Sequence, residues 1–394
     1  MSRPAGYLGP EILRQTDVMS FEPLKAPVPL SKLESLPVYK PGKSAEATMA
    51  QYGLKFAAKL SSNENPYGPL PAVVEAIARA AHDINRYPDT NSTELKAVLC
   101  AHVKVEGPRL TVASGSSGVL LQTLNAFAGP GDEVLFGWRS FEAYPIFTRV
   151  HGATDVTVPL CGFDLDLEAI AAAVTGRTKV VLLANPNNPT GTALHRQALD
   201  AFLDAVPARV LVVLDEAYRE FIQPGATPDG VETYADRTNV LVSRTLSKAY
   251  GLAGMRTGYA VSTPEIIAAL DKVAPPFSLS NVTQAAAVAA VGCEKELQER
   301  VDIINRERNR IVAAVRAMGL PVPESHANLV WLPAGRATAD LFEAMETKGV
   351  VARAFANEGV RISVGSPEEN DLMLSALSFA RERVDLDPAW IRFG

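Results

Sequence analysis

The chain has few residues of the types that form disulfides or bind metals. Its 394 residues include only three cysteines, Cys100, Cys161 and Cys293, and five scattered histidines. An odd number of widely separated cysteines without a CxxC pair argues against a disulfide framework, and no histidine pair has the spacing of a metal site. We therefore predict no metal site, and we interpret the cysteines as small buried apolar residues.

The chain also lacks a long apolar run and an excess of positive charge. No stretch approaches the ~20 apolar residues of a membrane span, and the amino terminus has no apolar core of the signal-peptide type. A net charge of −6 disfavours nucleic acid and anionic membranes as partners, since both require a basic surface. We predict a cytoplasmic protein that binds neither membrane nor nucleic acid.

Short apolar runs alternate with helical segments between about residues 60 and 280, and this alternation predicts an α/β fold. Runs that are apolar on both faces indicate a mostly parallel sheet sandwiched by helices. Residues 285–394 instead combine a long charged helix with short strands, which is typical of a smaller α+β domain. We predict an N-terminal arm (1–34), a small domain (35–64 and 285–394) and a large domain (65–284). The predicted strands are EVLFG (133–137), KVVLLA (179–184), RVLVVLD (209–215), NVLVSR (239–244), NLVWLP (328–333), VVARAF (350–355) and GVRISVG (359–365), and the predicted helices are 166–174, 195–206, 293–319 and 367–384.

Polar residues occur where predicted strands end. In open parallel sheets, ligands bind beyond the carboxyl ends of the strands, where helix N-termini also point. The segments at these strand ends are SGSSG (114–118), NPNNPTG (185–191), DEAY (215–218) and SRTLSK (243–248). The small residues of SGSSG either form a phosphate cradle from backbone N–H groups or only cap a helix.

Asp215 and Lys248 bring opposite charges to two of these strand ends. Asp215 follows an apolar strand, so its carboxylate needs a cation, which either an arginine or a protonated pyridine nitrogen can supply. Lysines in loops are usually surface residues, but a lysine desolvated near other cations loses its proton readily and becomes a Schiff-base nucleophile. Arg256, Thr245 and Ser247 can bind a phosphate. Together these groups match pyridoxal 5′-phosphate (PLP).

Several segments, in order along the chain, resemble one enzyme family. From about residue 36 to residue 381 the chain resembles the fold-type I PLP-dependent aminotransferases, and within them the histidinol-phosphate and aromatic-amino-acid aminotransferases. The resemblance implies a large PLP-binding domain and a smaller α+β domain. Its segments are LPVYKPGK (36–43), LSSNENPYGP (60–69), RYPD (86–89), NPNNPTG, DEAY, TLSKAYGLAGMRTGY (245–259) and GVRISVGSPEEN (359–370).

The resemblance implies roles for residues around the cofactor. Lys248 would bind PLP covalently and afterwards move a proton between substrate and cofactor. Asp215 would keep the pyridine nitrogen protonated, and Asn188 and Tyr218 would hydrogen-bond the ring oxygen. The phosphate would be bound by Ser116, Ser117, Thr245, Ser247 and Arg256, joined by Tyr67 of a second subunit.

The same resemblance implies how the ring and the substrate are held. Phe141 would stack on the pyridine face, with Trp138 as the alternative. Arg361 would bind the substrate α-carboxylate in a bidentate fork and so leave the Cα–H bond perpendicular to the ring plane, which favours proton loss. Because Tyr67 would reach across to another subunit, we expect a homodimer with active sites at the interface. Many relatives carry an acidic pair at positions 117 and 118, where this chain has serine and glycine, but backbone donors survive that change.

Two substrates are compatible with the resemblance, with glutamate and 2-oxoglutarate as the common pair. Histidinol phosphate has a dianionic head, for which Arg353 and Tyr39 are the candidate partners. An aromatic amino acid needs a flat apolar slot, and FGWRSFEAYPIF (136–147) supplies ring surface. We predict an aromatic-amino-acid aminotransferase with a ping-pong mechanism, and histidinol-phosphate aminotransferase is the alternative. Tyr39 and Asn328 would help to shape the pocket.

Three other classes of protein are possible on part of this pattern. A PLP-dependent lyase would share every cofactor residue but show no half-reaction with an amino donor. A non-catalytic regulator on this fold would usually carry an added basic DNA-binding segment, which we do not find. A dinucleotide-binding enzyme is excluded, because no GxGxxG follows the first strand.

Overall fold

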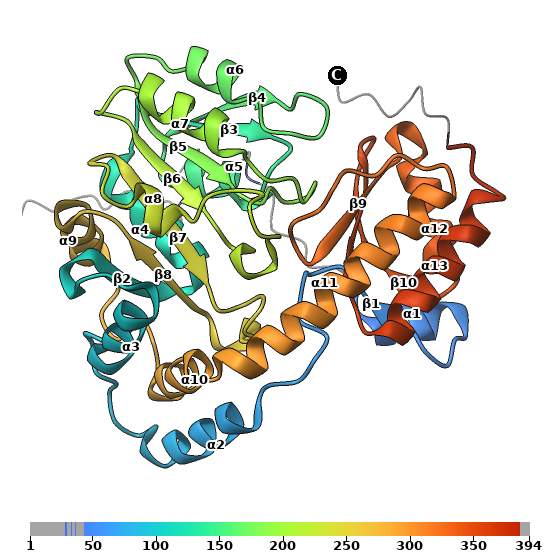
Figure 1. Ribbon diagram of the computed structural model, residues 1–394, viewed down its shortest axis with the longest axis horizontal. Helices are drawn as coiled ribbons and strands as arrows, with labels where there is room; N and C mark the ends of the chain where they lie inside the picture. The colour runs from blue at the N-terminus through green and yellow to red at the C-terminus, as the bar shows by residue number, and fades with distance from the viewer. Residues whose placement is uncertain (1–27, 30–32, 34–35, 37–42, 387–394) are drawn as a thin grey trace, which may run out of the picture.

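The computed structural model describes residues 28–29, 33, 36 and 43–386. Most of the predicted N-terminal arm, and Tyr39, lie outside these described residues. Figure 1 shows two lobes, a larger one built around a wide sheet and a smaller one that contains β9, α12 and α13. Among the helices of the described chain, none combines the length and the apolar character needed to cross a membrane.

The large lobe contains a seven-stranded sheet with the strand order β2-β8-β7-β6-β5-β3-β4. Its central strands pair in parallel, as predicted, and only β8 runs antiparallel to both of its neighbours. The strands are β2 (Leu110–Ser114), β3 (Glu133–Trp138), β4 (Thr154–Pro159), β5 (Thr178–Ala184), β6 (Leu211–Asp215), β7 (Val240–Thr245) and β8 (Thr257–Val261).

Alternate residues of the central strands enter two separate apolar cores, one on each face of the sheet. In β6, Val212 and Leu214 belong to one core, while Leu211 and Val213 belong to the other. This is the two-residue period of a strand buried on both faces. The helices of this lobe are α2 (Pro71–Ala80), α3 (Thr93–Val103), α4 (Gly115–Phe127), α5 (Ala143–Val150), α6 (Leu167–Ala172), α7 (Arg196–Ala205), α8 (Gly230–Tyr234), α9 (Pro264–Val273) and α10 (Asn281–Val291).

The small lobe contains a three-stranded antiparallel sheet, β11-β12-β9, and a separate parallel pair, β1 with β10. The single strand predicted over 350–355 is wrong in one respect: it divides at Ala352, because β10 pairs with β1 whereas β11 pairs with β12. The strands are β1 (Ala58–Lys59), β9 (Leu329–Pro333), β10 (Val350–Val351), β11 (Arg353–Phe355) and β12 (Gly359–Ser363), and the helices are α1 (Ala45–Tyr52), α12 (Thr338–Glu346) and α13 (Pro367–Arg381).

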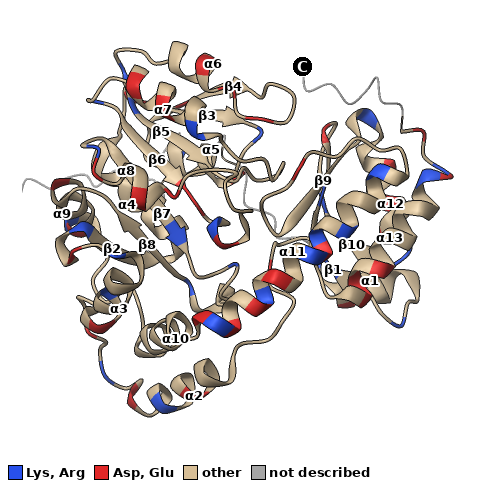
Figure 2. Ribbon diagram, viewed as in Figure 1, with Lys and Arg blue, Asp and Glu red and all other residues tan. Residues whose placement is uncertain are grey.

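The long helix α11 (Glu294–Ala317) runs from the large lobe to the small lobe (Figure 1). It carries residues of both charge signs along its length (Figure 2), and it ends just before Gly319, whose φ of 77° favours glycine. The helices predicted over 293–319 and 367–384 are thus present, the second ending at Arg381. The proposed domain boundary at 284/285 lies within α10 and stays a prediction.

Candidate active site

One cavity collects most of the predicted site residues at the carboxyl ends of β6 and β7. Both lobes contribute to it, because Arg353 and Arg361 come from β11 and β12. Segments that are far apart in sequence therefore meet at one point, as predicted for ligand sites at the carboxyl ends of parallel strands. The predicted residues that line the cavity are Ser116, Ser117, Phe141, Asn188, Asp215, Tyr218, Thr245, Ser247, Lys248, Arg256, Arg353 and Arg361.

The remaining predicted residues do not line this cavity within the described chain. Asn328 is fully buried, and its side-chain amide donates to the backbone carbonyls of Asn63 and Glu64, so it supports a neighbouring segment. Tyr67 and Trp138 are also absent from the lining. Tyr39 lies outside the described residues.

Asp215 ends β6 with its side chain on the cavity side of the sheet. Because side chains alternate along a strand, Asp215 lies on the same face of the sheet as Leu211 and Val213. Its Oδ2 accepts a 2.8 Å hydrogen bond from the hydroxyl of the buried Tyr144. Its Oδ1 is buried with no hydrogen-bond partner among the described residues. Burial raises the pKa of Asp215 to about 6, against the opposing effect of Tyr144. At neutral pH the group is therefore mostly a carboxylate, with one oxygen available to a cationic ligand.

Lys248 follows β7, and its Nζ donates a 3.3 Å hydrogen bond to the backbone carbonyl of Ser62. Burial, together with the guanidinium groups of Arg361 and Arg256, lowers the pKa of Lys248 to about 8. A substantial fraction of the amine is then neutral near physiological pH, as a nucleophilic or basic lysine requires.

The first turn of α4 and the loop around Arg256 form a cradle for an anion. Arg256 Nη1 donates to Ser247 Oγ at 3.3 Å. A Cβ on Gly115 would lie 2.6 Å from Arg256 Nη2, and a Cβ on Gly258 would lie 2.3 Å from the backbone nitrogen of Ser116. Only glycine at these two positions allows the arginine and β8 to approach the helix start so closely. The helix N-terminus and the guanidinium thus point to the same region of the cavity.

Arg361 is held in place by neutral groups. Its Nη1 donates to Asn188 Oδ1 at 2.7 Å, and its Nη2 donates to the carbonyl of Ser61 at 2.6 Å. Asn63 connects this region to Tyr218, because its Nδ2 donates to the Tyr218 hydroxyl at 2.9 Å while its Oδ1 accepts from Ser363 Oγ. Asn63 therefore links the small lobe to a cavity residue of the large lobe.

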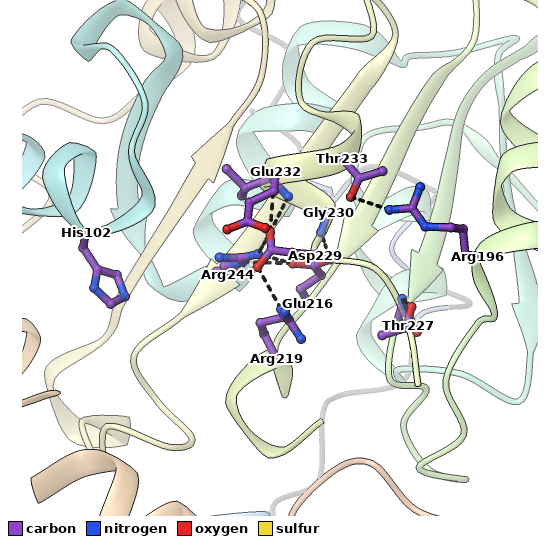
Figure 3. Close-up of polar contacts among 12 residues, drawn as sticks. His102, Arg196, Glu216, Arg219, Thr227, Asp229, Gly230, Glu232, Thr233 and Arg244 are labelled. Carbon is purple, nitrogen blue, oxygen red and sulfur yellow. Dashed lines mark hydrogen bonds and ion pairs between the residues drawn. The ribbon is translucent and has the colours of Figure 1, made fainter. Parts of the chain in front are cut away.

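A buried ion-pair network lies behind Asp215, on the opposite face of the sheet. Arg244 donates to Glu216 Oε2 through Nε and Nη2, at 2.9 and 2.7 Å, and Nη2 also contacts Asp229 Oδ1 at 2.7 Å. Arg219 points to the same Asp229, and Glu216 Oε1 accepts from the backbone of Gly230 at the start of α8 (Figure 3). Successive side chains at the end of a strand point to opposite faces of the sheet, so Asp215 faces the cavity while Glu216 faces the ion-pair network.

The network should be strongly stabilising only while it is complete. The Arg244 and Glu216 side chains are just 8% and 1% exposed, so Arg244→Met would leave a buried carboxylate uncompensated. We expect the free energy of unfolding to fall by ~3–5 kcal/mol, measured by urea denaturation. The double variant Arg244→Met/Glu216→Gln should recover part of this loss, because it removes the orphaned charge. A single variant within ~1 kcal/mol of the parent would contradict this view of the network.

Sequence reasoning missed several residues at the site, among them Tyr144, Glu142, Asn63, Ser61 and Ser62. Tyr144 and Glu142 lie within FGWRSFEAYPIF (136–147), and Asn63 lies within LSSNENPYGP (60–69). The segments were informative, but their local patterns do not show which side chains reach Asp215, Arg353 or Tyr218. The backbone of Asn63 has a φ of 51°, a left-handed conformation that asparagine adopts more readily than most residues.

Comparison with known proteins places this site among described enzymes. Residues 57–377 match the family described as "Aminotransferase class I and II". An aromatic amino acid aminotransferase of Thermobifida fusca is 50% identical over 351 residues, covering 89% of this chain and 96% of that protein. That of Streptomyces coelicolor is 52% identical over 345 residues, covering 87% and 95%. Among solved structures, histidinol-phosphate aminotransferase from Sinorhizobium meliloti, in complex with pyridoxal 5′-phosphate, has a TM-score of 0.82 and 33% identity, and covers 92% of this chain and 99% of that one.

Proposed function

The chain belongs to the class I and II aminotransferases, and from that premise we propose that it transfers the amino group of an aromatic L-amino acid to 2-oxoglutarate by a ping-pong mechanism. The family is PLP-dependent. The observation that carries the proposal is that Lys248, Asp215 and Arg361 line one cavity together with the anion cradle around Arg256.

The described residues fit PLP on grounds of their own chemistry. The unsatisfied buried Oδ1 of Asp215 suits a protonated pyridine nitrogen. The cradle of Arg256 and the α4 N-terminus, which a Cβ at Gly115 would fill, suits the phosphate. Lys248 would hold the cofactor covalently through Nζ. Asn188 and Tyr218 would hydrogen-bond the ring oxygen, and Phe141 would stack on the ring. The further phosphate ligands would be Ser116, Ser117, Thr245 and Ser247.

When bound, PLP would supply an electron sink for the electrons released at the substrate Cα. Arg361 would bind the α-carboxylate through its two Nη atoms and fix the orientation of the Cα–H bond. Lys248 Nζ would accept the proton from Cα, a task for which a pKa of about 8 is well placed. The ionised Asp215 would stabilise the positive charge of a protonated pyridine nitrogen.

The aromatic substrate class is supported by two observations. The relatives that cover most of this chain at about half identity act, by name, on aromatic amino acids. In the cavity lining, the Arg353 guanidinium is paired with the Glu142 carboxylate, so this part of the site suits an uncharged side chain.

A second candidate is histidinol-phosphate aminotransferase, favoured by the solved structure at 33% identity and by the position of Arg353 in the cavity. A phosphate monoester needs more than one cation or donor, however, and Arg353 is already paired with Glu142. The aromatic substrate therefore has the stronger support.

A substrate panel tests the choice between them. Initial rates of 2-oxo-acid formation are measured with phenylalanine, tyrosine and histidinol phosphate as donors and 2-oxoglutarate as acceptor. We expect kcat/KM for the aromatic donors to exceed that for histidinol phosphate by roughly tenfold or more, since an uncompensated dianion in a desolvated site is costly. A preference for histidinol phosphate would reverse the assignment, and no transfer from any donor would favour a lyase.

The proposal includes a cytoplasmic homodimer with active sites at the subunit interface. Tyr67 is partly buried and does not line the cavity of its own chain, which is compatible with a role at the phosphate of a second subunit. Sedimentation velocity measures the mass in solution, and a monomer at micromolar concentration would contradict this part of the proposal.

A further inference from the structure

Glu142 lines the cavity, but it takes no part in the proposed contacts to the cofactor or to the substrate α-carboxylate. It immediately precedes α5 in the large lobe, and its carboxylate accepts hydrogen bonds from Nε and Nη2 of Arg353, both at 3.1 Å. Both residues line the cavity, and their side chains are 28% and 20% exposed. The pair therefore joins the two lobes inside the site.

The strand register explains why a carboxylate is needed at this position. Arg353 of β11 lies directly opposite Arg361 of β12, so the two guanidinium groups project from the same face of the small sheet. Arg361 donates to Asn188 and to the carbonyl of Ser61, and in the proposed function it binds the substrate α-carboxylate. Glu142 neutralises the second charge, at the position that the substrate side chain would reach.

We propose that Glu142 determines substrate specificity by setting the charge of the subsite that receives the substrate side chain. The subsite then favours a neutral aromatic side chain. It disfavours a side chain that ends in an anionic group, and more strongly when that group carries two charges. This inference rests on the proposed function. With Glu142 paired to Arg353, the subsite is neutral and matches an aromatic ring. The distal carboxylate of 2-oxoglutarate must compete with Glu142 for Arg353, and a phosphate head would bring two negative charges against the same carboxylate.

The inference predicts a graded response to removal of one charge. Glu142→Gln keeps the size of the side chain but removes the negative charge that faces Arg353. Each negative charge on the ligand head should then add roughly three- to tenfold in affinity, the range for partly exposed charge pairs. Three ligands without an amino group bind without reacting. At a pH above the second pKa of a phosphonate they differ in head charge: 3-phenylpropionate (neutral head), glutarate (one charge) and 4-phosphonobutyrate (two charges).

The dissociation constants of these ligands are measured by isothermal titration calorimetry on the PLP-loaded protein. We expect Glu142→Gln to leave the affinity for 3-phenylpropionate within about twofold, to increase that for glutarate about three- to tenfold, and to increase that for 4-phosphonobutyrate most. An equal change for all three ligands, or no change for any of them, would overturn the inference.

The chain contains a matched control. Arg139 and Glu358 form a second ion pair between the lobes, but neither lines the cavity, so Glu358→Gln should leave all three affinities unchanged. If it reproduced the graded effect, lobe closure rather than subsite charge would be the cause, and the inference would be wrong. Glu142→Asp, which keeps the charge, should retain the order of affinities of the parent. The titrations require no turnover, so their result does not depend on whether the proposed function is correct. The proposed function itself fails if the parent enzyme transfers no amino group from phenylalanine or tyrosine.

Discussion

Lys248→Ala is expected to reduce kcat for transamination of phenylalanine by at least ~10⁴-fold, because the substitution removes both the covalent attachment of the cofactor and the group that accepts the Cα proton. Steady-state rates with phenylalanine and 2-oxoglutarate measure the loss. The variant should still retain PLP after gel filtration, since Asp215, Arg256 and the α4 N-terminus are unchanged. The absorbance of the filtered protein reports this retention independently of activity.

Two further variants separate the chemistry of Lys248 from its charge. Lys248→Arg keeps a cation in the cavity but cannot attach the cofactor, so it should be as inactive as the alanine variant. Lys179→Ala removes a lysine that is 46% exposed near the amino end of β5, away from the carboxyl strand ends that form the cavity, and should stay within twofold of the parent. Substantial turnover by either Lys248 variant would assign the reaction to another residue.

Asp215→Asn is expected to lower kcat/KM by ~10²–10⁴-fold. The change preserves shape but removes the buried charge that would face the pyridine nitrogen, and the loss of one partner of such a pair costs ~3–5 kcal/mol. The dissociation constant of PLP, measured by fluorescence titration of the apoprotein, should rise as well. A variant within tenfold of the parent in both measurements would contradict the role of Asp215.

Tyr144→Phe is the matched control for this prediction, because it removes the 2.8 Å hydrogen bond to Asp215 and leaves the carboxylate in place. Tyr144 acts only through Asp215, so the expected loss is about tenfold, the value of one hydrogen bond to a charged group. The pKa of Asp215 should also rise above about 6, because the hydrogen bond that lowers it is gone. NMR titration of the cofactor-free protein measures this change in pKa.

The sequence predicts the parallel part of the large sheet well, since a strand buried on both faces must be apolar at nearly every position. Two features could not be predicted in the same way. β4 is an edge strand with mostly exposed or half-exposed residues, so it has no apolar run. The division of the strand at Ala352 depends on two different partner strands, and that choice is made by tertiary contacts.

The residues at strand ends were predicted because topology brings them together whatever the details of packing. Asp215 and Lys248 follow neighbouring strands, β6 and β7, so their proximity follows from strand order alone. Tyr144 and Glu142 could not be found this way, because they reach Asp215 and Arg353 from a helix and from the residue before it. Their contacts depend on helix orientation and on the position of the small lobe, which local sequence does not encode.

Borohydride reduction of the PLP-loaded protein, followed by peptide mapping with mass spectrometry, tests the central claim most directly. The reduction makes the attachment between lysine and cofactor permanent and identifies its position. The structure predicts one pyridoxyl group per chain, on the peptide that contains Lys248. A pyridoxyl group on a different lysine, or an unmodified chain after loading and reduction, would contradict the account.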